Sequence, residues 1–169
     1  MVQNIDVIFT IADYRNIAYV IFLLVALIVE RKITSIVVVL FVLAIGENLT
    51  NELTQSILEI SRQDGIEYKF VWYGFWSTYS LFGIYTIYFL HNKLKIRASS
   101  GANFVSFIML FWGLCQVVDF IDRVTWDSAF FAAFYQYSIV VTNLLITPML
   151  LLFWLRDIHK ERFVKYKEV

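Results

Sequence analysis

The chain has 169 residues, of which 60% are hydrophobic and 18% aromatic, and its 14 basic residues balance its 14 acidic residues. Soluble domains are roughly 45–50% apolar, so this composition excludes a disordered linker and a disulfide-stabilised mini-protein and disfavours a soluble enzyme. A zero net charge provides no bulk attraction for nucleic acid, and we expect no direct nucleic-acid binding. With a mean hydropathy of +0.68, the sequence predicts an all-α integral membrane protein.

Five apolar segments approach or exceed the length of about 20 residues that a membrane-spanning helix needs. In chain order they are residues 11–29, 33–47, 70–90, 103–120 and 130–155. Only Glu30, Arg31 and Lys32 separate the first two, which predicts a tight helical hairpin. Pro148 lies within the fifth, and we expect it to bend that helix because proline removes one backbone hydrogen bond. We therefore predict a single transmembrane domain over residues 1–169, built as a five-helix bundle.

The one long connection follows the second segment, over residues 48–62, and it has a helical pattern. Its apolar residues fall on one helical face, and its polar residues fall on another. We expect an amphipathic extension of the second helix that continues outward or lies along the membrane surface. Gly65 is expected to end this extension as a C-cap.

The charges predict how the bundle is oriented. Ten basic and four acidic residues fall on one side, and four basic and ten acidic residues on the other, which gives +6 and −6. Because cytoplasmic loops are rich in Lys and Arg, we expect the N-terminus outside and the C-terminus inside, in a plasma membrane or a bacterial inner membrane. Aromatic residues expected at the two interfaces are Tyr68, Trp72, Tyr73 and Trp126 outside, and Tyr88 and Trp154 inside. Basic residues expected to contact inner lipid headgroups or a partner are Lys93, Lys95, Arg97, Arg156, Lys160 and Arg162.

Polar residues within the predicted spans gather in the outer third of the membrane. They lie about 20–24 Å above the inner ends of their helices, at 1.5 Å per residue, whereas the inner half is almost entirely apolar. These candidate site residues are Asp13, Arg15, Glu47, Asn48, Gln116, Asp119, Asp122, Arg123 and Asn143. Charges in hydrocarbon need partners or water, so we expect Asp13 and Arg15 to associate with Glu47, and Arg123 with Asp119. Either these side chains reach the outer headgroups, or they line an outward-facing polar vestibule.

The sequence contains no motif that predicts catalysis or cofactor binding. Cys115 is the only cysteine, so no intrachain disulfide forms, and we expect a small buried hydrophobic residue there. His91 and His159 are predicted to be interfacial or exposed, and two histidines do not supply the ligand sets of haem or zinc. We therefore predict a protein that is not an enzyme and has no cofactor or metal.

Two functional hypotheses stay open. The first is a homo-oligomeric channel-like or transport-related bundle, with its pore between protomers. In that case the acidic outer mouth attracts cations, and the apolar inner half acts as a gate. The alternative is a non-enzymatic membrane-embedded sensor, scaffold or effector subunit that works with a soluble cytoplasmic partner.

Overall fold

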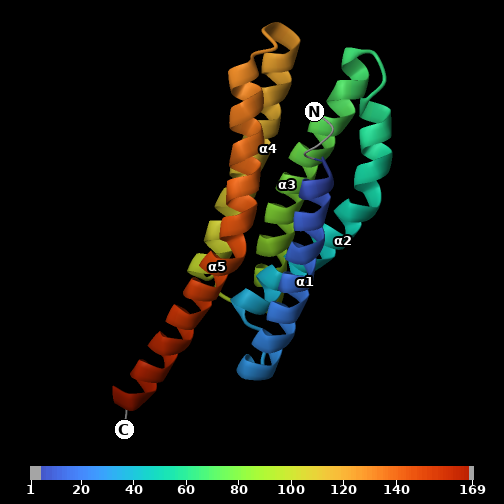
Figure 1. Cartoon of the computed structure of the whole chain (residues 1–169). Helices are drawn as coiled ribbons and strands as arrows, with labels where there is room; N and C mark the ends of the chain where they lie inside the picture. Colours follow the sequence, from blue (N-terminus) through green and yellow to red (C-terminus); the bar gives the residue numbers. More distant parts are fainter. Residues whose placement is uncertain (1–4, 168–169) are drawn as a thin grey trace.

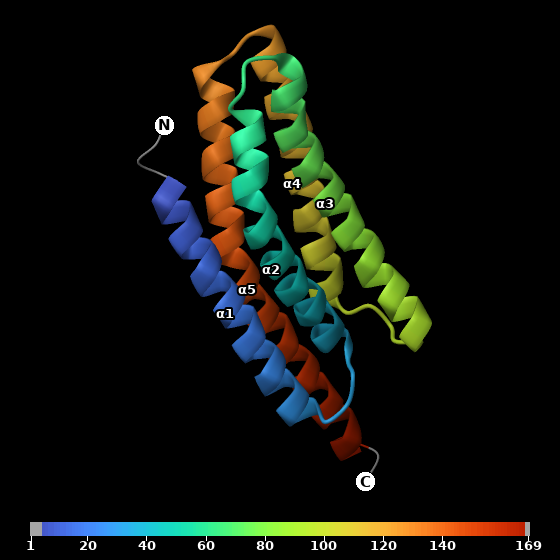
Figure 2. The ribbon, with the colours of Figure 1, turned by 90° about the vertical axis from the view of Figure 1, so that its right-hand side faces the viewer.

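The computed structural model describes residues 5–167, and the side chains of residues 14–128 and 130–160. This part of the chain forms five α-helices, which are α1 (Ile5–Glu30), α2 (Ser35–Ser61), α3 (Ile66–Leu94), α4 (Ser100–Thr125) and α5 (Ala129–Lys167). Figures 1 and 2 show these helices along one long axis, joined by short connections. The prediction of an all-helical fold is confirmed. We call the half with the α2–α3 and α4–α5 turns, at the top of Figure 1, the upper half, and the other the lower half.

Three helices of the described chain are long and apolar enough to cross a membrane. They are α2, α4 and the stretch Phe130–Lys160 of α5. All three overlap segments that the sequence predicts to span, and they are consistent with a membrane protein. The predicted third span lies within α3, where tyrosine, serine and threonine are mixed with the apolar residues and reduce its hydropathy.

The second predicted span and its amphipathic extension form one uninterrupted helix, α2. This helix ends at Ser61, with Arg62 as its C-cap. Gly65 lies instead at the N-cap of α3, where its φ of 134° is a conformation that glycine adopts without steric cost. The prediction that Gly65 caps α2 was therefore wrong, because the helix ends before it and the glycine directs the chain into α3.

Contacts among α2, α3 and α4 form the centre of the bundle. α3 packs most extensively on α4, α2 lies against both α1 and α3, and α5 packs on α4 and touches α1. The core of the lower half includes aliphatic side chains that are fully buried between the helices. They include Val39, Leu40, Ile87, Val105, Ile146 and Leu150.

α5 is the helix that the rest of the bundle covers least. In the most apolar 18-residue stretch of each helix, 17% of the residues of α5 are buried, compared with 50% in α2 and in α4. The helix continues through Pro148, and Figure 1 shows its ribbon changing direction along its length. The helix also extends past the lower end of the bundle, so α5 presents an apolar surface along its side and a basic helical segment at its end.

Candidate functional site

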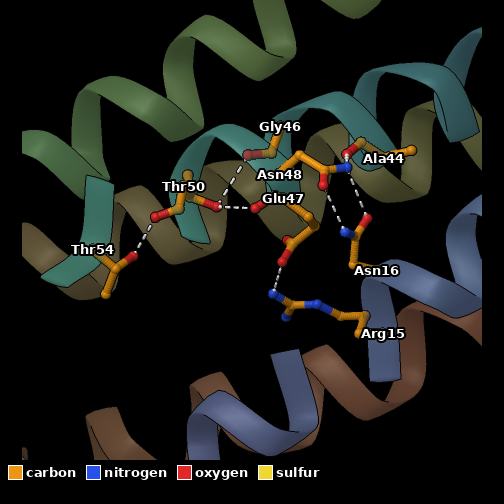
Figure 3. Close-up of polar contacts among 8 residues, drawn as sticks. All are labelled: Arg15, Asn16, Ala44, Gly46, Glu47, Asn48, Thr50 and Thr54. Atoms are coloured by element: carbon orange, nitrogen blue, oxygen red, sulfur yellow. Dashed lines mark hydrogen bonds and ion pairs between the residues drawn. The ribbon is translucent and has the colours of Figure 1, made fainter. Parts of the chain in front are cut away.

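Two consecutive side-chain pairs join α1 to α2 in the upper half (Figure 3). Arg15 forms an ion pair with Glu47, and their side chains are only 14% and 5% exposed. One residue further along both helices, the amides of Asn16 and Asn48 exchange hydrogen bonds of 3.0 and 3.2 Å. The predicted pairing of Arg15 with Glu47 is confirmed, whereas the side chain of Asp13 lies outside the described residues.

A glycine brings α3 close to this ion pair. A Cβ atom at Gly46 would lie 2.5 Å from the Tyr79 hydroxyl, so the missing side chain allows the tyrosine to approach α2. The neighbouring polar side chains of α2 are satisfied within the helix, since Asn48 donates to the Ala44 carbonyl at 2.7 Å and Thr50 to the Gly46 carbonyl at 3.0 Å. The ion pair is thus enclosed by α1, α2 and α3.

A second cluster connects α3 to α4 around Asp119, which is 2% exposed. Its Oδ2 accepts a hydrogen bond from the Tyr73 hydroxyl at 2.7 Å and another from Arg123 Nε at 3.1 Å. The predicted pairing of Asp119 with Arg123 is confirmed. Tyr73, which we expected at the outer interface, is instead buried between the helices, because its hydroxyl has this carboxylate as its partner.

Asp122 has a structural role at the turn between α4 and α5. Its Oδ2 accepts a hydrogen bond from the Ser128 backbone at 2.9 Å, and its carbonyl accepts from the backbones of Trp126 and Asp127 at 2.8 and 2.7 Å. Arg123 also lies 3.8 Å from Asp127. These contacts fix the backbone at the turn, where Asp127 has a φ of 49°.

Further hydrogen bonds connect α4 to α5 below this turn. Gln116 is buried and donates to the Tyr135 hydroxyl at 2.7 Å, and the Trp112 indole donates to Thr142 at 2.6 Å. Asn143 is half-buried beside Thr142. The predicted site residues therefore come together in two groups, one between α1 and α2 and one between α4 and its neighbours.

A row of aromatic side chains on α3 lies between the two groups. Trp76 contacts Trp72 and Tyr79, with ring centroids 5.7 and 5.8 Å apart. Tyr79 lies beside the ion pair of Arg15 and Glu47. Trp72 lies beside Tyr135 of α5. The row thus connects the two polar groups across the bundle.

The upper half contains buried polar atoms with no hydrogen-bond partner in the described part of the chain. We call this set the upper polar atoms. They are Arg15 Nε, Trp76 Nε1, Gln116 Oε1, Asp119 Oδ1, Asp122 Oδ1 and Asn143 Oδ1. More than about 90% of buried polar groups in proteins are hydrogen-bonded, many to water. Two of the six atoms are donors and four are acceptors, so the set favours water or a ligand that donates.

A third polar cluster lies at the lower end of the bundle, where the sequence predicted none. His91 is only 3% exposed, and its Nδ1 donates to the Ile87 carbonyl at 2.7 Å because a carbonyl can only accept. Its Nε2 lies 2.8 Å from Ser35 Oγ, which also accepts a hydrogen bond from the Ser99 backbone at 2.9 Å. The prediction that His91 is interfacial or exposed was wrong, whereas His159 is exposed as predicted.

The structure explains why His91 is buried. α3 ends with Lys95 in the left-handed conformation, at a φ of 54°, and the Ile96 backbone donates to the His91 carbonyl at 2.9 Å. The chain then turns so that Ser99 caps α4 and reaches the start of α2. His91 and Ser99 lie 56 and 64 residues from Ser35 in the sequence, so no local pattern could have revealed this cluster.

The basic residues that we expected to contact headgroups or a partner are exposed wherever their side chains are described. These are Lys93, Lys95, Arg97, Arg156 and Lys160, while the side chain of Arg162 is outside the described part. Arg156 donates to Ser100 at 2.6 Å and lies 5.2 Å from the Phe153 ring centre. Trp154, expected at the inner interface, is instead buried and donates to Glu30 at 2.8 Å.

Within the described residues, no group of three or more His, Cys, Asp or Glu side chains is placed to hold a metal ion. The chain matches no protein-family model, no curated protein and no solved structure.

Proposed function

We propose that all five helices cross the membrane, with the N-terminus outside and the C-terminus inside. The upper half then faces the outside, and the protein acts as a homo-oligomeric channel-like bundle with a hydrated acidic outer region. Three helices with the length and composition of spans support the membrane location. The surplus of basic residues on the lower side supports the orientation.

The observation that carries this proposal is the position of the upper polar atoms. They come from α1, α3, α4 and α5 and make up six of the nine such atoms among the described residues; the other three belong to Tyr19, Thr34 and Ser106. Buried polar atoms in a membrane are costly unless water or a partner reaches them, so their concentration supports a water-accessible vestibule. Their excess of acceptors, together with the carboxylate of Asp122, favours cations over anions.

The lower half supports a gate. Leu151, Leu152 and Leu155 are exposed on the lower part of α5 and form an apolar surface that would line a pore between copies of the chain. Apolar constrictions of this kind exclude water and stop conduction until they widen. A cation that enters the vestibule would therefore stop at this level in the closed protein.

The uncovered surface of α5 supports an oligomer. Gln136 is exposed on this surface, two helical turns from Asn143. An amide facing lipid hydrocarbon is unfavourable, and interhelical hydrogen bonds between protomers are a common solution. Five helices are also too few to enclose a wide pore alone, so we place the pore between copies of the chain.

Measurement of ion flux in liposomes tests the proposal, and Asn143 is the residue to substitute. Its Oδ1 has no hydrogen-bond partner in the described chain, so a substitution breaks no hydrogen bond to that atom. We expect Asn143→Asp to raise the preference for cations and Asn143→Lys to lower it. Thr125→Lys adds the same charge at an exposed upper position outside the vestibule and should leave the selectivity nearly unchanged. Absence of any flux above empty liposomes would refute the channel proposal.

The topology has its own test. In a Cys115→Ala background, single cysteines at Arg31 and Asp64 are treated from outside with a membrane-impermeant thiol reagent. We expect Asp64→Cys to react and Arg31→Cys to react only after the membrane is opened. Reaction of Arg31→Cys from outside would refute the orientation, whatever the flux assay shows.

One observation favours the second function, a subunit that works with a soluble cytoplasmic partner. α5 continues as a helix to Lys167 and projects beyond the lower end of the bundle in Figure 1. The segment after Trp154 carries Arg156, Lys160, Arg162, Lys165 and Lys167. A basic helical projection suits an acidic protein surface. Stoichiometric co-purification of a soluble protein that is lost when residues 158–169 are deleted would support this function.

A further inference from the structure

A groove between α4 and α5 in the upper half is lined in part by Asp119, whose Oδ1 is one of the upper polar atoms. Its cavity volume is about 230 Å3. The residues lining it are Phe111, Leu114, Cys115, Val118 and Asp119 of α4, and Phe131, Phe134 and Tyr135 of α5. Rim residues such as Leu114 and Phe134 are exposed on the outer surface of the bundle, whereas Cys115 and Asp119 are buried. The groove therefore opens sideways, toward the surface that lipid covers if these helices span a membrane.

The base of the groove contains a carboxylate in an otherwise apolar lining. Oδ2 of Asp119 is occupied by Tyr73 and Arg123, at 2.7 and 3.1 Å. Oδ1 of Asp119 is buried and has no partner in the described chain. An apolar recess with an unpartnered acceptor buried beneath its lining is a form that a small-ligand site can take.

We propose that this groove binds the hydroxyl end of a long-chain lipid alcohol, which enters from the membrane and donates a hydrogen bond to Asp119. The aromatic and aliphatic rim contacts the first carbons of the chain. An apolar cavity of about 150 Å3 is enough to bind benzene, so the volume here accommodates the hydroxyl and the carbons next to it.

Charge selects a neutral donor over the other common lipid termini. Arg123 already balances the charge of Asp119, so an ammonium group would add an uncompensated positive charge beside it. A fatty-acid carboxylate would place a second negative charge next to Oδ1. A hydroxyl supplies the missing donor without changing the charge of the site.

The test is photolabelling of the full-length protein in liposomes. Three probes are compared, each with a diazirine near one end of the same hydrocarbon chain: a primary alcohol, the alkane without the hydroxyl, and the carboxylic acid. After irradiation, labelled positions are mapped by peptide mass spectrometry. A hydrogen bond to a charged acceptor predicts that the alcohol labels the groove residues roughly tenfold more than the alkane does.

Two matched variants complete the experiment. Leu114→Trp fills the rim of the groove, and Leu145→Trp places the same side chain on an exposed position of α5 that does not line it. We expect the first to abolish selective labelling by the alcohol and the second to preserve it. Neither residue belongs to the polar clusters, so both variants should fold.

Equal labelling by the alcohol and the alkane would overturn the proposal, as would labelling spread evenly over the lipid-facing surface. Stronger labelling by the acid would also overturn it. Since photolabelling is measured without ion flux, its failure is separate from failure of the channel proposal.

Discussion

Trp154 donates its indole N–H to Glu30 across 2.8 Å, which joins the lower end of α5 to the lower end of α1 although the residues are 124 positions apart. Few other contacts hold these two helices together. Trp154→Phe keeps most of the ring packing and leaves the carboxylate without this donor. We expect a loss of about 1–2 kcal/mol in the free energy of unfolding, measured by denaturant titration in mild detergent. Trp126→Phe, at an exposed tryptophan, is the control and should change stability little; equal losses from the two variants would contradict the assignment.

The buried pair of Arg15 and Glu47 should show strong coupling. Glu47→Gln leaves the guanidinium without a counter-charge inside the bundle, and we expect a loss of about 3 kcal/mol. Replacing both residues by methionine removes both charges, so this double variant should recover most of that loss. This double variant and its two single components, Arg15→Met and Glu47→Met, form a double-mutant cycle, and the same titration gives the coupling energy. Additive effects of the two single substitutions would show that the interaction between the two side chains contributes nothing to the free energy of unfolding.

Ser35 and Ser106 are both 7% exposed, which makes them a matched pair for testing the lower polar cluster. Ser35→Ala removes the partner of His91 Nε2 and of the Ser99 backbone, and we expect a cost of about 2 kcal/mol. Ser106 Oγ has no partner in the described chain, so Ser106→Ala should be neutral or stabilising. Thermal unfolding of the two variants gives the comparison, and a larger loss at Ser106 would refute the role given to His91.

We predict that Gly46 tolerates no side chain, although most other residues have a higher helix propensity than glycine. Alanine is better than glycine in a helix by about 1 kcal/mol, yet a methyl group at Gly46 would meet the Tyr79 hydroxyl. We expect Gly46→Ala to destabilise the protein and the added change Tyr79→Phe to restore it. Gly113→Ala, whose new atom would lie at an ordinary 3.5 Å from its nearest neighbour, should be neutral or stabilising in the same thermal assay.

The sequence predicted the helices well because apolar runs of spanning length are a local signal. It also predicted two buried ion pairs, since Arg15, Glu47, Asp119 and Arg123 are charges in apolar segments that need partners. Both inferences use only residue type and position along one helix.

The errors involve residues that have two roles. Tyr73 and Trp154 have the amphipathic side chains that are typical of membrane interfaces, yet both use the polar atom as a donor inside the bundle. His91 lies next to a basic loop, and its burial depends on the turn that brings Ser99 back to Ser35. Such contacts are set by the packing of helices distant in sequence, which residue patterns do not contain.

The two adjacent pairs between α1 and α2 have a consequence for the biogenesis of the protein. Arg15 and Asn16 find Glu47 and Asn48 within the first two helices, before any later residue is required. If α1 and α2 both span the membrane, as proposed, the first helical hairpin can leave the insertion machinery with this ion pair formed and its register fixed. Asp119, by contrast, depends on Tyr73 from the preceding helix. If all five helices span the membrane, the bundle can thus assemble in the order of synthesis, because Glu47 and Asp119 each meet a partner from an earlier helix.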